Sequence, residues 1–237
     1  MQIIQKNLKV ISLSDIHFGH EDQKALKLVK EFIKEERPDV IILNGDILDA
    51  YDASSFLQDP NKNGGMREEI GHAKEFLKWL RLGNPLAYIG FLEGNHEDRL
   101  RKVVWQSPMI AKLFPNLNLK SLLGLDELKI EHRLYGDSII INNTVFTHGH
   151  KTSAKAPYDY MASYALSGTS GHTHNLGMSC KNVGQKTLYW VESGCLCMTN
   201  PEYVKGIANW HQGFAFGTSL GSNIYLKPMS IIGGNIV

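Results

Sequence analysis

The chain has 237 residues, of which 43% are hydrophobic and 21% charged, as is ordinary for a globular protein with a sizeable core. The 25 Lys and Arg residues almost balance the 24 Asp and Glu residues, giving a formal net charge of +1. This balance excludes a whole-protein field that would attract nucleic acid or a membrane, so any polyanion must be bound locally.

The three cysteines, Cys180, Cys195 and Cys197, are an odd number and lack the paired C-x-x-C spacing of a zinc module. This argues against a disulfide framework and favours a reducing compartment, so we expect a cytoplasmic protein. Met1 to Lys9 is mixed and polar, and no later stretch reaches the roughly 18 apolar residues that a membrane span requires. We therefore expect neither export nor membrane insertion.

In the first half of the chain, short apolar runs alternate with longer amphipathic stretches. This pattern is typical of βαβ units that build a mostly parallel sheet. One predicted helix follows the N-cap Asp22 and ends at Arg37-Pro38; a second, with apolar residues from Ile70 to Leu80, ends at Gly83-Asn84-Pro85. The predicted strands are Val10–Ser14, Asp39–Asn44 and Leu86–Leu92.

The middle of the chain, Asp98 to Leu128, is basic, leucine-rich and predicted to be helical. Strand-like pieces punctuated by Gly and Asn follow it, which suggests hairpins. A mixed two-sheet core flanked by helices accommodates both halves, and we expect residues 1–237 to form a single domain, weakest between Gly124 and Arg133. The later predicted strands are Ser138–Asn142, Thr144–Thr147, Thr187–Glu192, Gly213–Thr218 and Asn223–Lys227.

Five segments place ligand-type residues directly after apolar runs. In open α/β sheets, the loops at the carboxyl ends of strands converge on one crevice, so these residues can meet there. Singly, each segment has an ordinary explanation as a cap or a turn, but coincidence does not explain five in order. They are Asp15-Ile16-His17, Gly45-Asp46-Ile47-Leu48-Asp49, Gly94-Asn95-His96-Glu97, His148-Gly149-His150 and Gly171-His172-Thr173-His174.

Imidazole and carboxylate ligands together suit manganese, iron, zinc or nickel rather than calcium. A bridging carboxylate can hold two such ions roughly 3.5–4 Å apart, and the pair polarises a phosphoryl oxygen and lowers the pKa of a bridging water. A hydroxide is then available near neutral pH. The ligand types therefore predict a site for two divalent cations that hydrolyses a phosphate ester.

The same segments, in this order, resemble the signature D-x-H, G-D-x-x-D, G-N-H-[DE], H and G-H-x-H of the calcineurin-like metallophosphoesterase superfamily, over about two-thirds of the chain. The resemblance implies a four-layer α/β/β/α fold and two divalent ions, for which we expect Mn²⁺. It implies that Asp46 bridges the ions. The implied ligands of the first ion are Asp15, His17 and His174, and those of the second are Asn95, His148 and His172.

The resemblance also assigns His96 to catalysis, where it would stabilise the transition state or protonate the leaving oxygen. Asp49 would orient and charge it, because a histidine acts as an acid only when a partner fixes its tautomer and supports the cationic form. Arg99 and Arg101 could bind a phosphate group, since Arg matches phosphate oxygens bidentately. His20 and His150 lie beside ligand motifs and are further candidates for substrate contact.

Three functions remain open from sequence. The first is a phosphodiesterase or nuclease that uses a metal-bridging hydroxide; nucleic acid as a substrate is compatible with the motifs but is not indicated by the net charge. The second is a phosphomonoesterase acting on phosphoprotein, nucleotide or sugar phosphate, although Ala50 replaces the arginine that follows the second Asp in protein phosphatases. The third is a dimetal scaffold without activity. The motifs do not address the oligomeric state.

Overall fold

The computed structural model describes residues 7–55, 65–200 and 208–237. Its larger sheet has seven strands in the order β12-β11-β10-β1-β2-β3-β4. The strands β1 to β4 run parallel to one another, and β10 pairs antiparallel with β1. These strands are β1 (Lys9–Leu13), β2 (Val40–Asn44), β3 (Tyr88–Leu92), β4 (Glu131–Arg133), β10 (Gly213–Leu220), β11 (Asn223–Ile232) and β12 (Asn235–Ile236).

A second sheet has five strands in the order β5-β6-β7-β9-β8. In it β6, β7 and β9 are parallel, while β5 and β8 pair antiparallel with their neighbours. Both sheets are therefore mixed. The strands are β5 (Ile139–Ile141), β6 (Thr144–Thr147), β7 (Ser167–Ser170), β8 (Leu176–Val183) and β9 (Lys186–Ser193).

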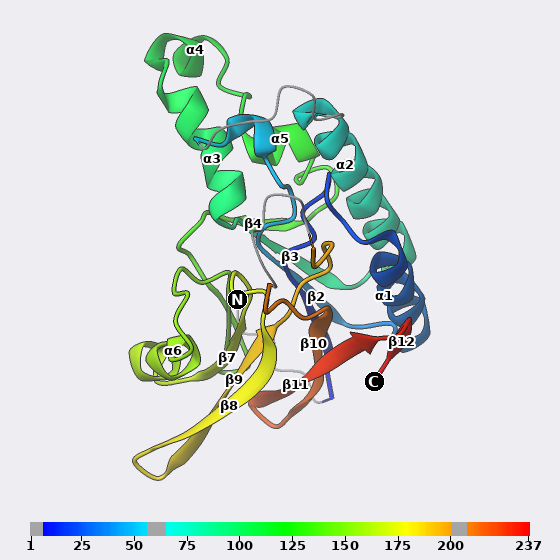
Figure 1. Cartoon of the computed structure of the whole chain (residues 1–237), viewed down its shortest axis with the longest axis vertical. Helices are drawn as coiled ribbons and strands as arrows, with labels where there is room; N and C mark the ends of the chain where they lie inside the picture. The colour runs from blue at the N-terminus through cyan, green and yellow to red at the C-terminus, as the bar shows by residue number, and fades with distance from the viewer. Residues whose placement is uncertain (1–6, 56–64, 201–207) are drawn as a thin grey trace.

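Helices cover the outer faces of both sheets (Figure 1). The helices α1 (Gln23–Glu36) and α2 (Met66–Gly83) lie against the larger sheet, and α6 (Ala156–Tyr164) lies against the smaller one. The predicted four-layer α/β/β/α arrangement is thus confirmed. The remaining helical segments are η1 (Tyr51–Ala53), α3 (Asn95–Trp105), α4 (Pro108–Leu113) and α5 (Leu119–Leu123).

The core is divided between the layers because strand side chains alternate between the two faces of a sheet. On β1, Ile11 and Leu13 face α1 and α2, whereas Val10 faces the second sheet. On the second sheet, Phe146 faces the first sheet and Val145 faces α6. The two sheets are therefore joined by a shared apolar layer, which fixes the edges where their strands end.

Local signals place α1 as predicted. The Asp22 carboxylate accepts hydrogen bonds from the backbone N–H groups of Lys24 and Ala25, at 2.9 and 3.0 Å, and so caps the first turn. At the other end, Arg37 adopts a left-handed conformation with φ of 48° before Pro38. Pro38 then leads directly into β2, which keeps the connection short.

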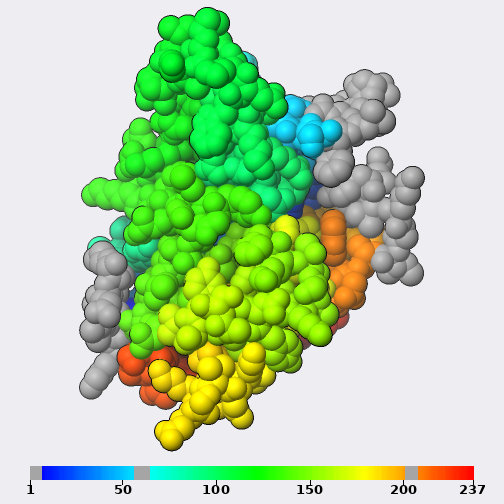
Figure 2. Space-filling model, turned by 90° about the vertical axis from the view of Figure 1, so that its left-hand side faces the viewer, coloured from blue at the N-terminus to red at the C-terminus, as the bar shows by residue number. Residues whose placement is uncertain are grey.

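The predicted strands are all present, but six of the described elements were not predicted: β4, β7, β8, β12, α6 and η1. The predicted helical middle is three separate helices, α3, α4 and α5. Figure 2 shows α3 and α4 (green) projecting from the rest of the molecule. Across the described residues, no helix combines the length and the apolar character needed to cross a bilayer.

Candidate metal centre

The residues predicted as ligands all follow strands of the parallel parts of the two sheets. Asp15 and His17 follow β1, Asp46 follows β2, and the first residues of α3 follow β3. From the second sheet, His148 follows β6, and the pair His172 and His174 follows β7. Because parallel strands present their carboxyl ends at the same edge, loops of both sheets meet at one place.

The first group of ligand atoms consists of Asp15, His17 and His174. The Nε2 atoms of His17 and His174 are 3.3 Å apart, and Asp15 Oδ1 lies 3.1 Å from His174 Nε2 and 3.8 Å from His17 Nε2. All three residues are buried. A carboxylate oxygen and two imidazole nitrogens thus converge as they would around one ion.

The second group consists of Asn95, His148 and His172. His148 Nε2 lies 3.1 Å from Asn95 Oδ1, and the rings of His148 and His172 are 5.2 Å apart. His148 Nδ1 is 2.9 Å from the backbone oxygen of Asn44. Since that oxygen only accepts, Nδ1 keeps a proton, which leaves Nε2 as the nitrogen that would bind a metal ion in place of its own proton.

Asp46 lies between the two groups. Its Oδ2 atom is 3.2 Å from His148 Nε2 and 3.9 Å from His17 Nε2. Its other oxygen, Oδ1, accepts a 2.9 Å hydrogen bond from the backbone N–H of His96, which fixes the carboxylate at the start of α3. One oxygen of Asp46 therefore faces ligand atoms of both groups, as a bridging carboxylate would.

The backbone at these positions is unusual. Five of the seven predicted metal ligands have positive φ, between 50° and 69°, a region that non-glycine residues seldom occupy. The neighbouring glycines are required by close approach, because a Cβ atom at Gly45 would collide with His148 and one at Gly94 with Asp46. The five ligands are Asp15, His17, Asp46, His172 and His174.

The buried carboxylates dominate the electrostatics. Burial opposes the charge on His148 and His174, but Asp46 beside the first and Asp15 beside the second raise the pKa of each imidazole to about 9. Burial likewise opposes the charge of Asp46, yet His148 and His96 hold its pKa well below its usual range. For His172, burial and the neighbouring His148 lower the pKa. The centre therefore attracts positive charge.

These residues fit two divalent cations. Asp15 Oδ1 is buried and has no hydrogen-bond partner among the described residues, although a buried carboxylate oxygen is costly to leave without one. This oxygen faces the same small space as the Nε2 atoms of His17 and His174. The groups of ligand atoms found together include Asp15, His17 and Asp46 in one case and Asp46, His148 and His172 in another, so the donors suit the borderline transition metals.

His96 stands beside this centre in a pocket of about 520 Å³. Its Nδ1 atom is 2.6 Å from the backbone oxygen of Asp49, and its Nε2 atom is 3.0 Å from the guanidinium of Arg99. A carbonyl only accepts and a guanidinium only donates, so Nδ1 bears the proton and Nε2 accepts. The partner that fixes the tautomer is thus the backbone of Asp49.

The Asp49 carboxylate contacts both His17 and His96. Its Oδ1 atom is 3.1 Å from His17 Nδ1 and 3.5 Å from His96 Nδ1. Burial opposes its charge, but the two imidazoles hold its pKa below its usual range. Asp49 therefore orients a predicted metal ligand at least as closely as it orients His96.

Comparison with known proteins identifies the family. The sequence matches the calcineurin-like phosphoesterase family over residues 8–212. The chain belongs to this family. Gene 54 protein of Mycobacterium phage L5 is 28% identical over 253 residues, covering 95% of this chain and 94% of the phage protein. Gene 54 protein of Mycobacterium phage D29 is also 28% identical, over 250 residues, with the same coverage.

The fold is shared with solved structures of low sequence identity. Vacuolar Protein Sorting 29 from Cryptosporidium parvum superposes with a TM-score of 0.55 at 11% identity, covering 98% of this chain and 96% of that one. This likeness concerns the fold alone. The resemblance inferred from the five motifs is confirmed by the family match, and the chain is a member of the calcineurin-like phosphoesterase family with a candidate metal-binding cluster of His and Asp residues.

The four candidates for substrate contact lie in different surroundings. Arg99 lines the pocket, and no carboxylate in the described part of the chain is within ion-pair distance of it. Arg101 instead forms ion pairs with Glu93 and Asp98 and is absent from the pocket wall. His20 lies 3.6 Å from an Asp49 oxygen, and His150 packs its ring against Tyr160; neither lines the pocket.

Three residues at or beside the candidate metal centre were not predicted from the sequence: Glu97, Cys197 and Trp210. Glu97 is buried, and its carboxylate accepts hydrogen bonds of 2.7 to 3.0 Å from the backbone of Gly94, Asp46, Ile47 and Leu48. Burial and repulsion from Asp46 raise its pKa to about 7 despite those donors. Cys197 lies 3.9 Å from His174 Nδ1, and Trp210 lines the pocket.

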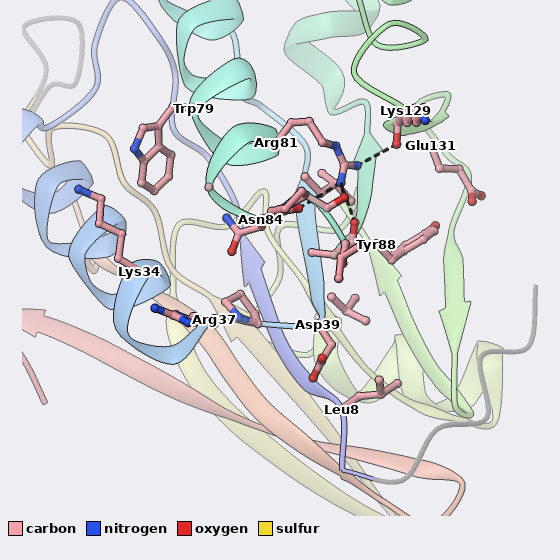
Figure 3. Close-up of a pocket in the computed structure, with 17 residues that line it drawn as sticks. Leu8, Lys34, Arg37, Asp39, Trp79, Arg81, Asn84, Tyr88, Lys129 and Glu131 are labelled. Carbon is pink, nitrogen blue, oxygen red and sulfur yellow. Dashed lines mark hydrogen bonds between the residues drawn. The ribbon is translucent and has the colours of Figure 1, made fainter.

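A larger cavity lies elsewhere in the described part of the molecule. It measures about 1060 Å³ and sits at the opposite, amino-terminal ends of β1 to β3, beside Leu8, Asp39 and Tyr88. Figure 3 shows Arg81 in its wall, where the guanidinium donates to backbone oxygens that include those of Lys129 and Ala87, both at 2.9 Å. The Arg81 guanidinium therefore stabilises the fold and is not available to a ligand. The clusters of potential metal ligands among the described residues lie at the other edge of the sheet.

Proposed function

We propose that the chain is a dimetal phosphodiesterase that acts on a nucleotide-type ester, with nuclease activity included in this class. The observation that carries the proposal is the position of Asp46 Oδ2, which faces His148 Nε2 at 3.2 Å and His17 Nε2 at 3.9 Å. When bound, two divalent cations would polarise the phosphoryl group and lower the pKa of a water molecule.

The protein residues supply binding and orientation around that chemistry. Arg99 offers its guanidinium to a phosphate oxygen, because its described partners are His96 Nε2 and the Asp49 carbonyl, neither of which is a carboxylate. His96 stands 3.8 Å from Asp46 Oδ2, next to the place where charge develops during hydrolysis. If Arg99 turned toward a phosphate, His96 Nε2 would be released to take up a proton from solvent, and the resulting imidazolium would stabilise or protonate the leaving oxygen.

The charge of the pocket supports a diester rather than a monoester. A phosphodiester carries one negative charge at neutral pH and a phosphomonoester carries nearly two. Within the described part of the chain, Arg99 is the single arginine or lysine that lines the pocket. The position after Asp49, where protein phosphatases have an arginine, is the buried Ala50. One guanidinium matches the monoanion of a diester.

The test is a substrate panel with the purified protein: bis-p-nitrophenyl phosphate, p-nitrophenyl phosphate, single-stranded DNA and cyclic nucleotides. Each is assayed with Mn²⁺, with Fe²⁺, Zn²⁺ or Ni²⁺, and with EDTA. We expect metal-dependent turnover with a higher kcat/KM for the diester. Asp46→Asn should abolish it, whereas Asp126→Asn, at an exposed carboxylate paired with Lys120, should not.

Two results would contradict the proposal. Full turnover in excess chelator after exhaustive dialysis would remove the metals from the reaction. A higher kcat/KM for the monoester would replace the diesterase by the phosphomonoesterase, the alternative that the motifs left open.

A further inference from the structure

Trp210 lies outside all five motifs, in the stretch that leads into β10. Its ring is 4.2 Å from the ring of His174, centroid to centroid, with an angle of 58° between the planes. It lines the same pocket as Arg99 and Tyr51. An indole therefore forms part of the pocket wall directly beside His174, one of the predicted metal ligands.

The backbone holds this indole in place. The N–H of the next residue, His211, donates to the carbonyl of His174 at 2.9 Å, and the His211 carbonyl accepts from Cys195 at 3.0 Å. The Asn209 side chain donates to Asn175 at 3.3 Å. Residues on both sides of Trp210 are thus attached to the loop that carries His174, so its position relative to the metal centre is fixed before a ligand arrives.

Trp210 also differs from the tryptophan that serves the core. Trp190 is fully buried, stacks with Tyr160 and Tyr164, and donates its indole N–H to Ser170 at 3.0 Å. Trp210 is half-buried, and among the described residues the one aromatic ring it contacts is that of His174. A partly open ring face in a pocket is a platform for another planar ring.

We propose that Trp210 forms a subsite for a nucleobase, so that the substrate of this centre is a phosphodiester of a single nucleotide unit or of a single-stranded end. The inference rests on the proposed function and specifies its substrate. His96 Nε2 lies 3.8 Å from Asp46 Oδ2 and 3.0 Å from the Arg99 guanidinium, so a phosphate bound beside Asp46 would be close to Arg99. Trp210 lines the same pocket, where the attached nucleoside would meet it.

Size and charge agree with this substrate. The pocket of about 520 Å³ is within the range of roughly 300–1,000 Å³ that is usual for small-molecule sites. A net charge of +1 gives little general attraction to a nucleic-acid backbone. Stacking on an aromatic ring supplies affinity without such attraction, and it tolerates any base because every base has a flat face.

The experiment compares two diesters with one leaving group: thymidine 5′-(p-nitrophenyl phosphate) and methyl p-nitrophenyl phosphate. They have the same charge and differ in the nucleoside. Trp210→Ala should raise KM for the thymidine ester about tenfold, within the range of base–aromatic stacking, and leave the methyl ester and the metal content unchanged. Trp210→Phe should restore most of the affinity. Trp105→Ala, at an exposed indole on α3, is the control and should match the wild type.

Other outcomes overturn the subsite. If Trp210→Ala impairs both esters equally, or loses a metal, the indole only supports His174. If it impairs neither, the ring does not meet the substrate.

A binding measurement separates this inference from the proposed function. Should the wild type hydrolyse neither ester, the diesterase proposal fails, and the subsite is judged by titrating the Mn²⁺-loaded protein with thymidine 5′-monophosphate and with methyl phosphate. Tighter binding of the nucleotide that disappears in Trp210→Ala supports the subsite, and equal affinities contradict it.

Discussion

At the scale of single residues, Asp49 has a second partner that the motif did not indicate. The sequence assigned it to His96, but its carboxylate lies closer to Nδ1 of His17, at 3.1 Å. The His17 nitrogen on the other side of the ring, Nε2, faces the first group of ligands. A carboxylate in this position fixes the ring of a metal ligand and raises its basicity.

We therefore expect Asp49→Asn to weaken metal binding as well as kcat. The amide keeps the backbone carbonyl that holds His96, so the orientation of His96 survives, whereas support for the charge on His17 is lost. The expected loss of metal affinity is about 10- to 100-fold, the usual effect of removing such a partner. Isothermal titration calorimetry with Mn²⁺ measures the metal affinity of the variant and of the wild type.

His96→Asn is the matched variant, and it should keep both metals while kcat falls about 10²–10⁴-fold. The loss should be smaller for a p-nitrophenyl leaving group than for a nucleoside hydroxyl, which needs more help from a proton. A metal lost from His96→Asn, or full metal affinity in Asp49→Asn, would reverse these two roles.

Arg99 and Arg101 were indistinguishable in the sequence, and the structure separates them. Arg99 lines the pocket, while Arg101 is held by Glu93 and Asp98. Arg99→Ala should raise KM for a diester about tenfold or more, because a hydrogen bond to a charged group is lost. Arg101→Ala should leave KM unchanged and affect stability alone. Equal KM values for both variants would show that the Arg99 guanidinium does not bind phosphate.

The predicted ligands come together in space because each belongs to a strand end, which an apolar run followed by Asp, Asn or His marks in the sequence. Trp210 does not belong to such a pattern of an apolar run followed by a ligand-type residue. Its place depends on the pairing of His211 with His174 across 37 positions of the chain, and no local pattern encodes that pairing. Glu97 was within a motif, and its place three residues after Gly94, at the start of a helix, would have indicated its contact with the Gly94 N–H but not those with Asp46, Ile47 and Leu48.

At the scale of elements, Glu97 joins two loops. One carboxylate accepts from Gly94 in the loop after β3 and from three successive N–H groups in the loop after β2. Asp46 is thereby held against the start of α3. The loop that carries the predicted bridging ligand and the loop that carries His96 thus move as one unit.

Glu97→Gln should break this connection at little change in size. The amide presents an NH₂ group to backbone N–H donors, so buried donors lose their acceptor, at a cost of about 1–3 kcal/mol in the free energy of unfolding. Denaturation in urea measures this cost, with Glu127→Gln, at an exposed position, as the control. A variant as stable as the wild type would mean that the loops are held by other contacts.

Elements with a strong apolar pattern were predictable, and those without one were not. Continuous apolar runs predict the buried strands β1, β2 and β3. Apolar residues at helical spacing predict α1 and α2. The β7 sequence SGTS has no apolar side chain, and most of β8 is exposed. Both are strands because neighbouring strands pair with them, and such pairing is a tertiary effect that propensity does not show.

At the scale of the whole molecule, the centre lies where the two sheets meet. Asp15, His17 and Asp46 come from the larger sheet, and His148 and His174 come from the smaller one. Ions bound by both sets would connect the sheets. Metal binding is then coupled to the stability of the native arrangement, since a ligand that binds only the folded state stabilises it.

The pKa shifts predict how this stabilisation depends on pH. Without metal, the pKa of His148 and of His174 is raised from 6.5 to about 9, so protonation stabilises the folded state fully below pH 6.5, and this contribution is lost as pH rises through 9. A divalent ion replaces those protons. The melting temperature in EDTA should therefore fall between pH 6.5 and 9, and the increase caused by Mn²⁺ should grow over the same range.

Thermal melts in the two conditions across this pH range provide the measurement, with His148→Asn expected to flatten both trends. An increase that is constant with pH would show that these histidines do not exchange protons for metal.

The left-handed backbone at five ligand positions limits how this centre can change during evolution. Asp, Asn and His tolerate positive φ better than other side chains, and glycine tolerates it best, whereas β-branched residues are strained there. A descendant that lost its metals by drift would still need one of these few residue types to keep its loops. Inactive relatives should therefore retain Asn, Gly, Asp or His at these positions, so that loss of chemistry leaves little trace in the pattern of residue types.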